Sequence, residues 1–196
     1  MSGVRSEGTG SPMRADARRN RRRLLDAAIE LVLATGAAPS RDAVAQRAGV
    51  GIGTLYRHFP DQQALLEAVA LDVLERTLAA GEAAVEEAAD GAEALHRYMH
   101  AAVDIGLGAL NIVYPLLDAP DWPERRARAD RLLGRLVRRA RRDGALPRGV
   151  TAADVALAVI RFGRPLAIGL PPATEREVAH RQIDTYLAGL AAMAAR

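Results

Sequence analysis

The sequence of 196 residues predicts an all-α fold. Alanine, leucine and arginine, which lose little rotamer freedom in a helix, dominate the composition, whereas aromatic residues make up only 4%. Apolar residues recur at helical spacing along most of the chain, and no segment alternates as a half-buried strand does. With 49% hydrophobic residues, the chain is able to bury the core of one compact domain, or of a small domain joined to a larger one.

The composition also bounds the compartment. The absence of cysteine excludes disulfides, thiolate metal sites and cysteine nucleophiles. Residues 1–23 lack the apolar stretch of a signal peptide, and the most apolar run, residues 105–117, is too short to span a bilayer. We therefore expect a cytoplasmic protein with no membrane partner.

Charge is distributed in blocks, and all 27 basic residues are arginines. Residues 14–60 hold nine arginines against four acidic residues, a balance of +5, and residues 61–124 hold two against thirteen, a balance of −11. Residues 125–142 return to nine against one, or +8. Two basic blocks therefore flank an acidic one, and only a motif decides which of them meets a polyanion.

Caps and breakers divide the chain into helices. Residues 1–13, rich in Gly and Ser without an apolar period, are expected to form a disordered tail. Three helices follow, from about Asp16 to a stop at Gly36, over Arg41–Ala48 after the cap Ser40, and over Ile52–Phe59. Further helices are expected near residues 62–89, 92–110, 111–117, 125–142, 151–168 and 174–193.

The stretch AGVGIGTLYRHF, residues 48–59, admits two interpretations. Its glycines at 49, 51 and 53 form the pattern G-x-G-x-G, which resembles a phosphate-binding loop. Such a loop needs a buried strand before it and a helix N-terminus aimed at the phosphates. Here a polar helix precedes it, and no G-K-[ST] follows in a chain without lysine. The pattern therefore disfavours a phosphate loop.

A helix-turn-helix explains the same residues one by one. Gly49 is able to adopt a positive φ at the end of the second helix, which turns the chain sharply. Ala45 is small enough to let two helices cross closely, and Leu55 fills the gap between them. Gly51 begins the next helix, and Gly53 on its outer face lets the backbone approach a groove wall.

The third helix then presents groups that contact nucleic acid. Leu55 and Phe59, four residues apart, are expected to point into the core. The outward positions then carry a hydroxyl, a phenol, a guanidinium and an imidazole, from Thr54, Tyr56, Arg57 and His58. These groups contact phosphates and base edges, and they lie in a region of charge +5. The alternative is an aromatic and basic surface with no partner.

Residues 40–69, SRDAVAQRAGVGIGTLYRHFPDQQALLEAV, closely resemble the DNA-binding segment of the tetracycline-repressor-like family of bacterial transcription regulators. In that family a short helix is followed by A-G-V, a variable pair, G-T-L-Y-x-H-F and a further helix. The resemblance covers residues 16–75, and beyond them only the helical plan and the length fit. It implies a DNA-binding domain over residues 14–60 and a ligand-sensing and dimerisation domain over residues 61–196.

The resemblance also implies roles for individual residues on double-stranded operator DNA. Ser40 and Arg41 would meet phosphate, Ile52, Gly53 and Thr54 would face bases, Tyr56 and His58 would hold the DNA backbone, and Arg57 would do either. Two positions depart from the family pattern. Gly51, at the start of the reading helix, replaces a common serine or threonine cap, and Gln62 replaces a common lysine or arginine that contacts phosphate.

For the second domain the resemblance implies a homodimer through the last two helices and a repressor released from a palindromic operator by a small molecule. The candidate pocket residues are Tyr98, Met99, Asn111, Tyr114, Trp122, Arg161 and Phe162. Ordinary core packing is the alternative for each. Arg161, a cation within an apolar helix, is expected to need either a carboxylate partner such as Asp154 or an anionic ligand.

Two further clusters carry alternative functions. His96 and His100 stand four residues apart with Glu93 and Asp104 on the same helical side, a pattern able to bind a divalent metal. The zinc-protease motif would need glutamate at position 97, which is arginine, so a solvated face is preferred and no metal, cofactor or catalytic residue is expected. A metal-dependent or hydrolytic enzyme is therefore the disfavoured alternative.

The arginines of residues 125–142 are the other cluster, and we expect them to pair with the acidic block instead of DNA. A protein that coats DNA without sequence preference remains a further alternative function.

Overall fold

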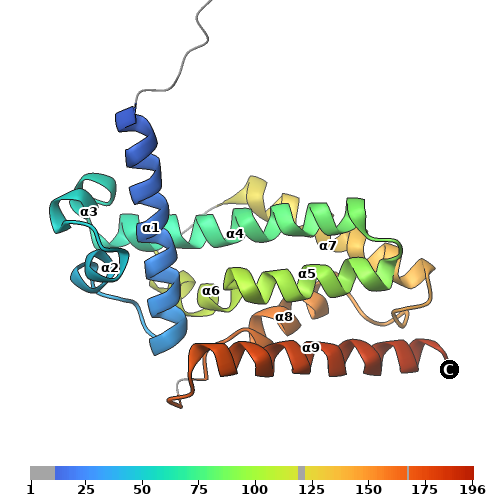
Figure 1. Ribbon diagram of the computed structural model, residues 1–196. Helices are drawn as coiled ribbons and strands as arrows, with labels where there is room; N and C mark the ends of the chain where they lie inside the picture. Colours follow the sequence, from blue (N-terminus) through green and yellow to red (C-terminus); the bar gives the residue numbers. More distant parts are fainter. Residues whose placement is uncertain (1–11, 119–121, 167) are drawn as a thin grey trace, which may run out of the picture.

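The computed structural model describes residues 12–118, 122–166 and 168–196, and within them the chain is entirely helical, with no strand (Figure 1). The predicted all-α class is confirmed. Of the expected disordered tail, residues 1–11 lie outside the described residues, and the first helix begins at Pro12 instead of near Asp16. Residues 119–121, between the helices expected at residues 111–117 and 125–142, also lie outside the described residues.

Nine α-helices and two short 3₁₀ segments make up the described part of the chain. Their bounds are α1 Pro12–Thr35, α2 Arg41–Ala48, α3 Ile52–His58, α4 Gln62–Glu87, α5 Gly91–Ile105, η1 Leu107–Ala109, α6 Leu110–Val113, η2 Tyr114–Leu116, α7 Pro123–Arg142, α8 Ala152–Phe162 and α9 Pro172–Ala194. In Figure 1, α1 crosses α4, and α2 and α3 lie on the side of α1 away from α5 and α9.

Two helices end earlier than their periodicity predicts. The helix expected over residues 92–110 stops at Ile105 because Gly106 adopts a left-handed conformation with φ of 93°, and short turns replace its continuation. The helix expected to reach residue 168 stops at Phe162. Gly163 follows it, and Pro165 then disfavours helical backbone at the residue before it.

A continuous core joins the N-terminal helices to the rest of the chain. The first three helices bury one apolar face each, with Leu24, Val44 and Leu55 fully inaccessible to solvent. Helix α4 begins beside them and then runs along α5 (Figure 1). Helix α5 is the centre of the second half of the chain, because it packs against α4, α7, α8 and α9.

Three arginines of α7 contact the acidic helix α4, and five others are exposed: Arg126, Arg131, Arg135, Arg138 and Arg142. Arg125 and Arg128 both pair with Glu75, at 2.9 and 2.8 Å, and Arg128 also pairs with Glu82 at 2.6 Å. Arg139 donates hydrogen bonds to two backbone carbonyls at the end of α4. The strongest basic block of the sequence therefore stabilises the packing of α7 on α4.

Within the described residues, no single helix has both the length and the apolar composition needed to cross a membrane. Helix α5 together with residues 107–116 meets these criteria only as a pair that bends by 59°.

Candidate nucleic-acid interface

The turn between α2 and α3 has the geometry that its sequence predicts. Helix α2 begins where the Ser40 hydroxyl oxygen accepts a hydrogen bond from the Ala43 amide at 3.2 Å. It ends at Gly49, whose φ of 63° and ψ of 40° lie in the left-handed region. The amide of Val50 then donates to the Ala45 carbonyl at 3.1 Å, which closes the end of the helix.

Helix α3 begins without a side-chain cap. Gly51 occupies the N-cap position with extended backbone, at φ −66° and ψ 142°. The amide of Thr54 donates only to the Gly51 carbonyl, at 2.8 Å. A Cβ atom built on Gly51 or Gly53 would meet nothing within 4 Å, so this end of α3 is open to an approaching surface.

One face of α3 is fixed in the core. Leu55 is fully buried and Phe59 is 1% exposed. The guanidinium of Arg21, on α1, lies 4.8 Å from the centroid of the Phe59 ring, a distance typical of a cation–π contact. This packing fixes the rotation of α3 about its axis and decides which residues face outward.

The outward face of α3 carries the predicted contact groups. Ile52 is 39% exposed and Tyr56 is 44% exposed, which is high for large apolar side chains. The Arg41 guanidinium covers the Tyr56 ring at 4.6 Å and donates to the Pro60 carbonyl at 2.9 Å. Arg57 is exposed and donates to the Gly53 carbonyl and the Thr54 hydroxyl, each at 3.2 Å. The structure therefore brings the nine predicted DNA-binding residues to one end of the molecule.

The imidazole of His58 is kept neutral by its surroundings. Partial burial lowers its pKa, and the nearby positive charges of Arg21 and Arg57 lower it further. A neutral ring donates one N–H and accepts at its other nitrogen.

Gln62 has a structural partner that the sequence does not reveal. Its side-chain amide donates to the Pro39 carbonyl at 3.0 Å and so ties the start of α4 to the segment before α2. Gln62 therefore makes a contact within the protein, at a position where the family pattern often has a cation that contacts phosphate.

The arginine run at the middle of α1 is also committed to contacts within the protein. Arg22 binds the carboxylates of Asp26 and Asp72, with closest distances of 2.6 and 2.8 Å. This pairing lowers the pKa of Asp26, because hydrogen bonding to Arg22 outweighs partial burial. The side chain of Arg23 reaches the Gly49 carbonyl at 3.4 Å. The run thus anchors α1 to α4 and to the turn.

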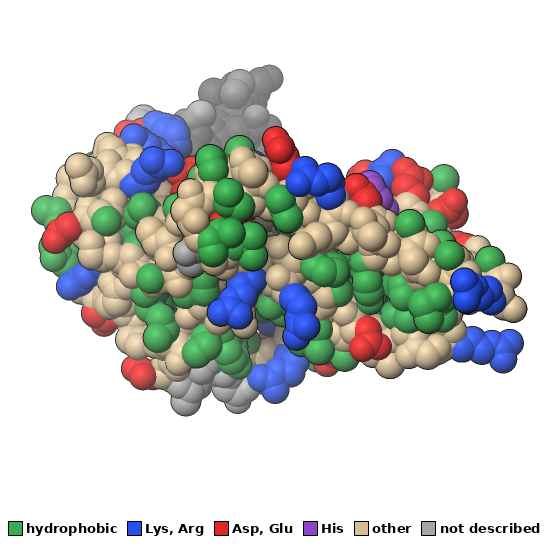
Figure 2. All heavy atoms as spheres, turned by 90° about the horizontal axis from the view of Figure 1, so that it is seen from below, with side chains coloured by type: hydrophobic (Ala, Val, Ile, Leu, Met, Phe, Trp, Pro, Cys, Tyr) green, Lys and Arg blue, Asp and Glu red, His purple; other side chains and the backbone are tan. Residues whose placement is uncertain are grey.

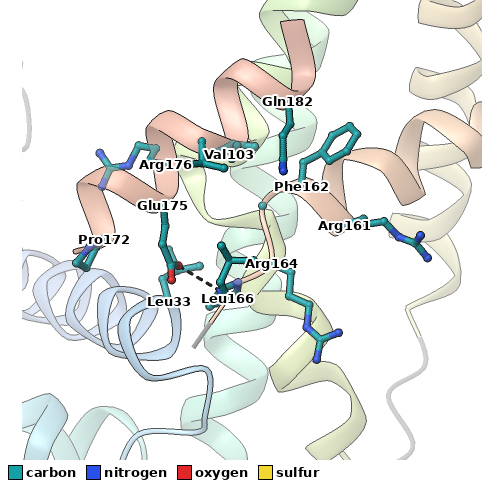
Figure 3. A pocket seen from close by; sticks show the side chains of 14 residues that line it. Leu33, Val103, Arg161, Phe162, Arg164, Leu166, Pro172, Glu175, Arg176 and Gln182 are labelled. Carbon is teal, nitrogen blue, oxygen red and sulfur yellow. Dashed lines mark hydrogen bonds between the residues drawn. The ribbon is translucent and has the colours of Figure 1, made fainter. Parts of the chain in front are cut away.

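A cavity of about 280 Å³ lies beside the C-terminal end of α1 (Figure 3). Leu33 of α1, Val103 of α5, Phe162 of α8 and residues of α9 line it. Glu175 crosses its mouth and accepts a hydrogen bond from the Leu166 amide at 3.4 Å. Arg161, Arg164 and Arg176 also line it, and in Figure 3 their side chains extend outward from the rim.

The structure separates the residues proposed from sequence for a pocket. Arg161 and Phe162 line the cavity, and with Asn111 they also line a more open neighbouring hollow of about 620 Å³. Tyr98 and Met99, 4% and 0% exposed, line neither, and core packing accounts for them. Tyr114, 41% exposed, packs edge-on against Trp122, and these two line neither cavity as well.

The expectation that Arg161 needs a carboxylate partner or an anionic ligand is wrong, because its side chain is exposed to solvent. Asp154, proposed as that partner, instead caps α8 by accepting from the Thr151 amide at 2.8 Å. The cation therefore stands at the rim of the cavity, in water.

Taken together, a left-handed turn, a following helix with a polar outward face, and a basic surrounding surface define a helix-turn-helix DNA-binding protein. The family model described as "Bacterial regulatory proteins, tetR family" matches residues 24–69. A TetR transcription regulatory protein of Mycobacterium vanbaalenii has a similar solved structure, with 32% identity and a TM-score of 0.62 over 91% of this chain and 99% of that one.

Another relative is the HTH-type transcriptional repressor LfrR of Mycolicibacterium smegmatis, 36% identical over 96 residues. That match covers 49% of this chain and 50% of LfrR, so the chain spans about half the length of the curated relatives it matches. The structure of LfrR from Mycobacterium smegmatis in complex with proflavine covers 87% of this chain and 95% of that one, with 25% identity and a TM-score of 0.59. The chain belongs to the TetR family of bacterial regulatory proteins. It is a helix-turn-helix transcription regulator, a class whose members are not enzymes.

Proposed function

We propose that the chain binds a palindromic operator as a homodimer and represses transcription until a small molecule releases it. Residues 14–60 form the DNA-binding domain and residues 61–196 the sensing and dimerisation domain. The observation that carries the proposal is the outward face of α3, where apolar, hydroxyl and basic groups stand together on a helix held rigidly from behind.

On the operator, α3 enters the major groove and its N-terminal residues read base edges. Ile52, Gly53 and Thr54 are the reading residues, since the open glycines let the backbone come close. Ser40, Arg41, Tyr56 and His58 hold phosphates on either side of the groove. Arg57 contacts either group, and Gly51 supports the close approach.

The dimer forms through α8 and α9. Leu157 on α8 and Met193 on α9 are 63% and 61% exposed, and Leu166, Ile168 and Leu170 between these helices are also exposed. Figure 2 shows hydrophobic side chains gathered over the face that this pair of helices presents. A patch of this kind favours association between copies. Dimerisation would set two α3 helices roughly 34 Å apart, one turn of DNA.

The effector occupies the cavity beside Phe162. LfrR has been solved with proflavine, and this chain offers an apolar floor with polar groups at the rim, which suits a small organic molecule. Because Leu33 of α1 lines the cavity, a ligand that displaces Leu33 moves the helix that also supports the turn. This contact is the physical link between effector and operator.

Gel shift with the DNA upstream of the protein's own operon tests the operator proposal. Binding at low salt with a discrete footprint is expected. Absence of binding at low salt contradicts the proposal, and equal affinity for all sequences supports the coating alternative instead. Leu157→Asp tests the dimer, because a charge on the exposed face is expected to shift sedimentation toward monomer and weaken operator binding.

The effector site is tested by filling it. Small molecules, beginning with proflavine, are screened for release of the operator. Phe162→Trp replaces a lining side chain with a larger one that fills part of the cavity, and the variant is expected to stay on the operator at effector concentrations that release the wild type. Release of both proteins at the same concentration would contradict this placement.

A further inference from the structure

Three of the chain's four histidines gather on one surface between α5 and α9. His96 and His100 lie one turn apart on α5, and His180 comes from α9. Their rings stack in sequence, with centroids 4.1 Å apart for His96 and His100 and 4.5 Å apart for His100 and His180. Histidine side chains are visible beside acidic ones at the edge of the face in Figure 2.

Asp184 of α9 completes a set of three converging ligand atoms. Its Oδ1 lies 2.9 Å from Nε2 of His100 and 3.3 Å from Nε2 of His96. The three ligand atoms lie within 4.8 Å of one another. Ligands at about 2.0–2.1 Å from a tetrahedral Zn²⁺ stand roughly 3.3 Å apart, so small side-chain rotations bring these atoms onto one ion.

A second layer of contacts supports His100. Its Nδ1 lies 2.5 Å from Nδ1 of His180, and Nε2 of His180 lies 2.9 Å from Oδ1 of Asp104. Metal-binding imidazoles commonly use their other nitrogen in such a chain, which orients the ring and fixes its tautomer. Here the chain ends on a carboxylate.

The hydrogen bonds of this group cannot all be satisfied by neutral histidines. The run Asp184, His100, His180, Asp104 contains three polar contacts, but two neutral imidazoles supply only two N–H groups. When both N–H groups serve the contacts to His180 and Asp104, the lone pair of His100 Nε2 faces the Asp184 carboxylate at 2.9 Å. A cation placed there resolves the conflict.

We propose that His96, His100 and Asp184 bind one divalent transition-metal ion of the Zn²⁺ class, with His180 and Asp104 as positioning residues. Two imidazoles and one carboxylate suit such ions better than Mg²⁺ or Ca²⁺, which prefer oxygen ligands. His96 and Asp184 are about half exposed, at 53% and 54%, so the ion has direct access from solvent. The ion clamps α5 against α9. The sequence of α5 alone favours a solvated face for His96 and His100, whereas the side chains that α9 brings beside them favour a metal site.

The test uses the full chain after chelator treatment, titrated with Zn²⁺ and, separately, with Co²⁺. We expect one Zn²⁺ per chain, a higher thermal midpoint with Zn²⁺, and visible absorption from bound Co²⁺. His100→Ala and Asp184→Asn are expected to lose all three signals. Asp104→Asn is expected to weaken Zn²⁺ binding about 10- to 100-fold. His58→Ala removes the one histidine outside the cluster and should bind Zn²⁺ as the wild type does.

Circular dichroism shows whether each variant is folded, and the half-exposed Asp184 provides a variant that does not disturb the core. Full Zn²⁺ affinity in folded Asp184→Asn and His100→Ala would overturn the proposal. A wild-type chain that binds neither ion would overturn it too, and would indicate that the cluster shares a proton only.

Discussion

The two glycines that flank Val50 are expected to respond in opposite ways to the same substitution. Gly49→Ser places a side chain on a left-handed residue, which costs about 1–2 kcal/mol. A Cβ atom there would also lie 2.9 Å from Nη2 of Arg23, so that side chain has to withdraw from the Gly49 carbonyl. Gly51→Ser places the same side chain at an extended N-cap position with open space around it.

At Gly51 the serine is expected to stabilise the protein. Its hydroxyl oxygen is able to accept from the first-turn amides of α3, a gain of a few tenths of a kcal/mol over glycine. Loss of chain freedom in the unfolded state adds about 0.4–1 kcal/mol to both variants. The net result is about 0.5–1 kcal/mol of stabilisation for Gly51→Ser and a similar destabilisation for Gly49→Ser.

Urea and thermal unfolding at one fixed protein concentration measure this difference, since the stability of the proposed dimer depends on concentration. The thermal midpoints of the two variants should differ by roughly 2–8 °C, with Gly51→Ser above the wild type. Equal shifts of the same sign would refute the assignment of a left-handed turn at Gly49 and an uncapped helix start at Gly51.

Three further predictions follow from the same geometry. Tyr56→Phe and His58→Ala should each weaken operator binding by a few-fold to about tenfold with unchanged thermal midpoints, and unchanged affinity in both would count against their placement on phosphate. Arg57→Gln should reduce the salt dependence of operator binding by about one phosphate contact. Arg128→Gln removes the same charge from α7; it should leave the salt dependence unchanged and lower the free energy of unfolding by at most about 1 kcal/mol. Equal salt slopes for the two variants would contradict this assignment. Burial raises the pKa of Tyr98 to about 12, so the unfolded chain releases that proton first and stability should fall as pH rises between 10 and 12, by at most about 1.4 kcal/mol per pH unit; Tyr98→Phe should remove this component in alkaline urea titrations, and identical profiles would argue against it.

Local rules predict the N-terminal part of the fold well. Ser40, Gly49 and Asp61 act on backbone groups only a few residues away, so their caps and turn are readable from the sequence. The bounds of α2 agree with the expectation for this reason. Periodicity fails at Gly106 and Gly163, where the apolar pattern continues but the backbone turns away.

Contacts between distant residues account for what the sequence does not show. His180 and Asp184 lie 80 and 84 residues from His100 in the sequence. The helical pattern of α5 therefore shows His96, His100 and Asp104, but not their partners on α9. Gln62 similarly finds Pro39 on another segment. For the pocket, composition cannot tell a buried tyrosine such as Tyr98 from a cavity wall, because both need an apolar side chain at a helical position.

Sequence-specific recognition by paired α3 helices is measured by a quantitative footprint on DNA fragments selected from the genome. We expect a protected palindrome with half-sites about one helical turn apart, and we expect Thr54→Ala to weaken protection of that site more than binding to random DNA. Protection without a preferred sequence, or a Thr54→Ala variant that loses both kinds of binding equally, would contradict it.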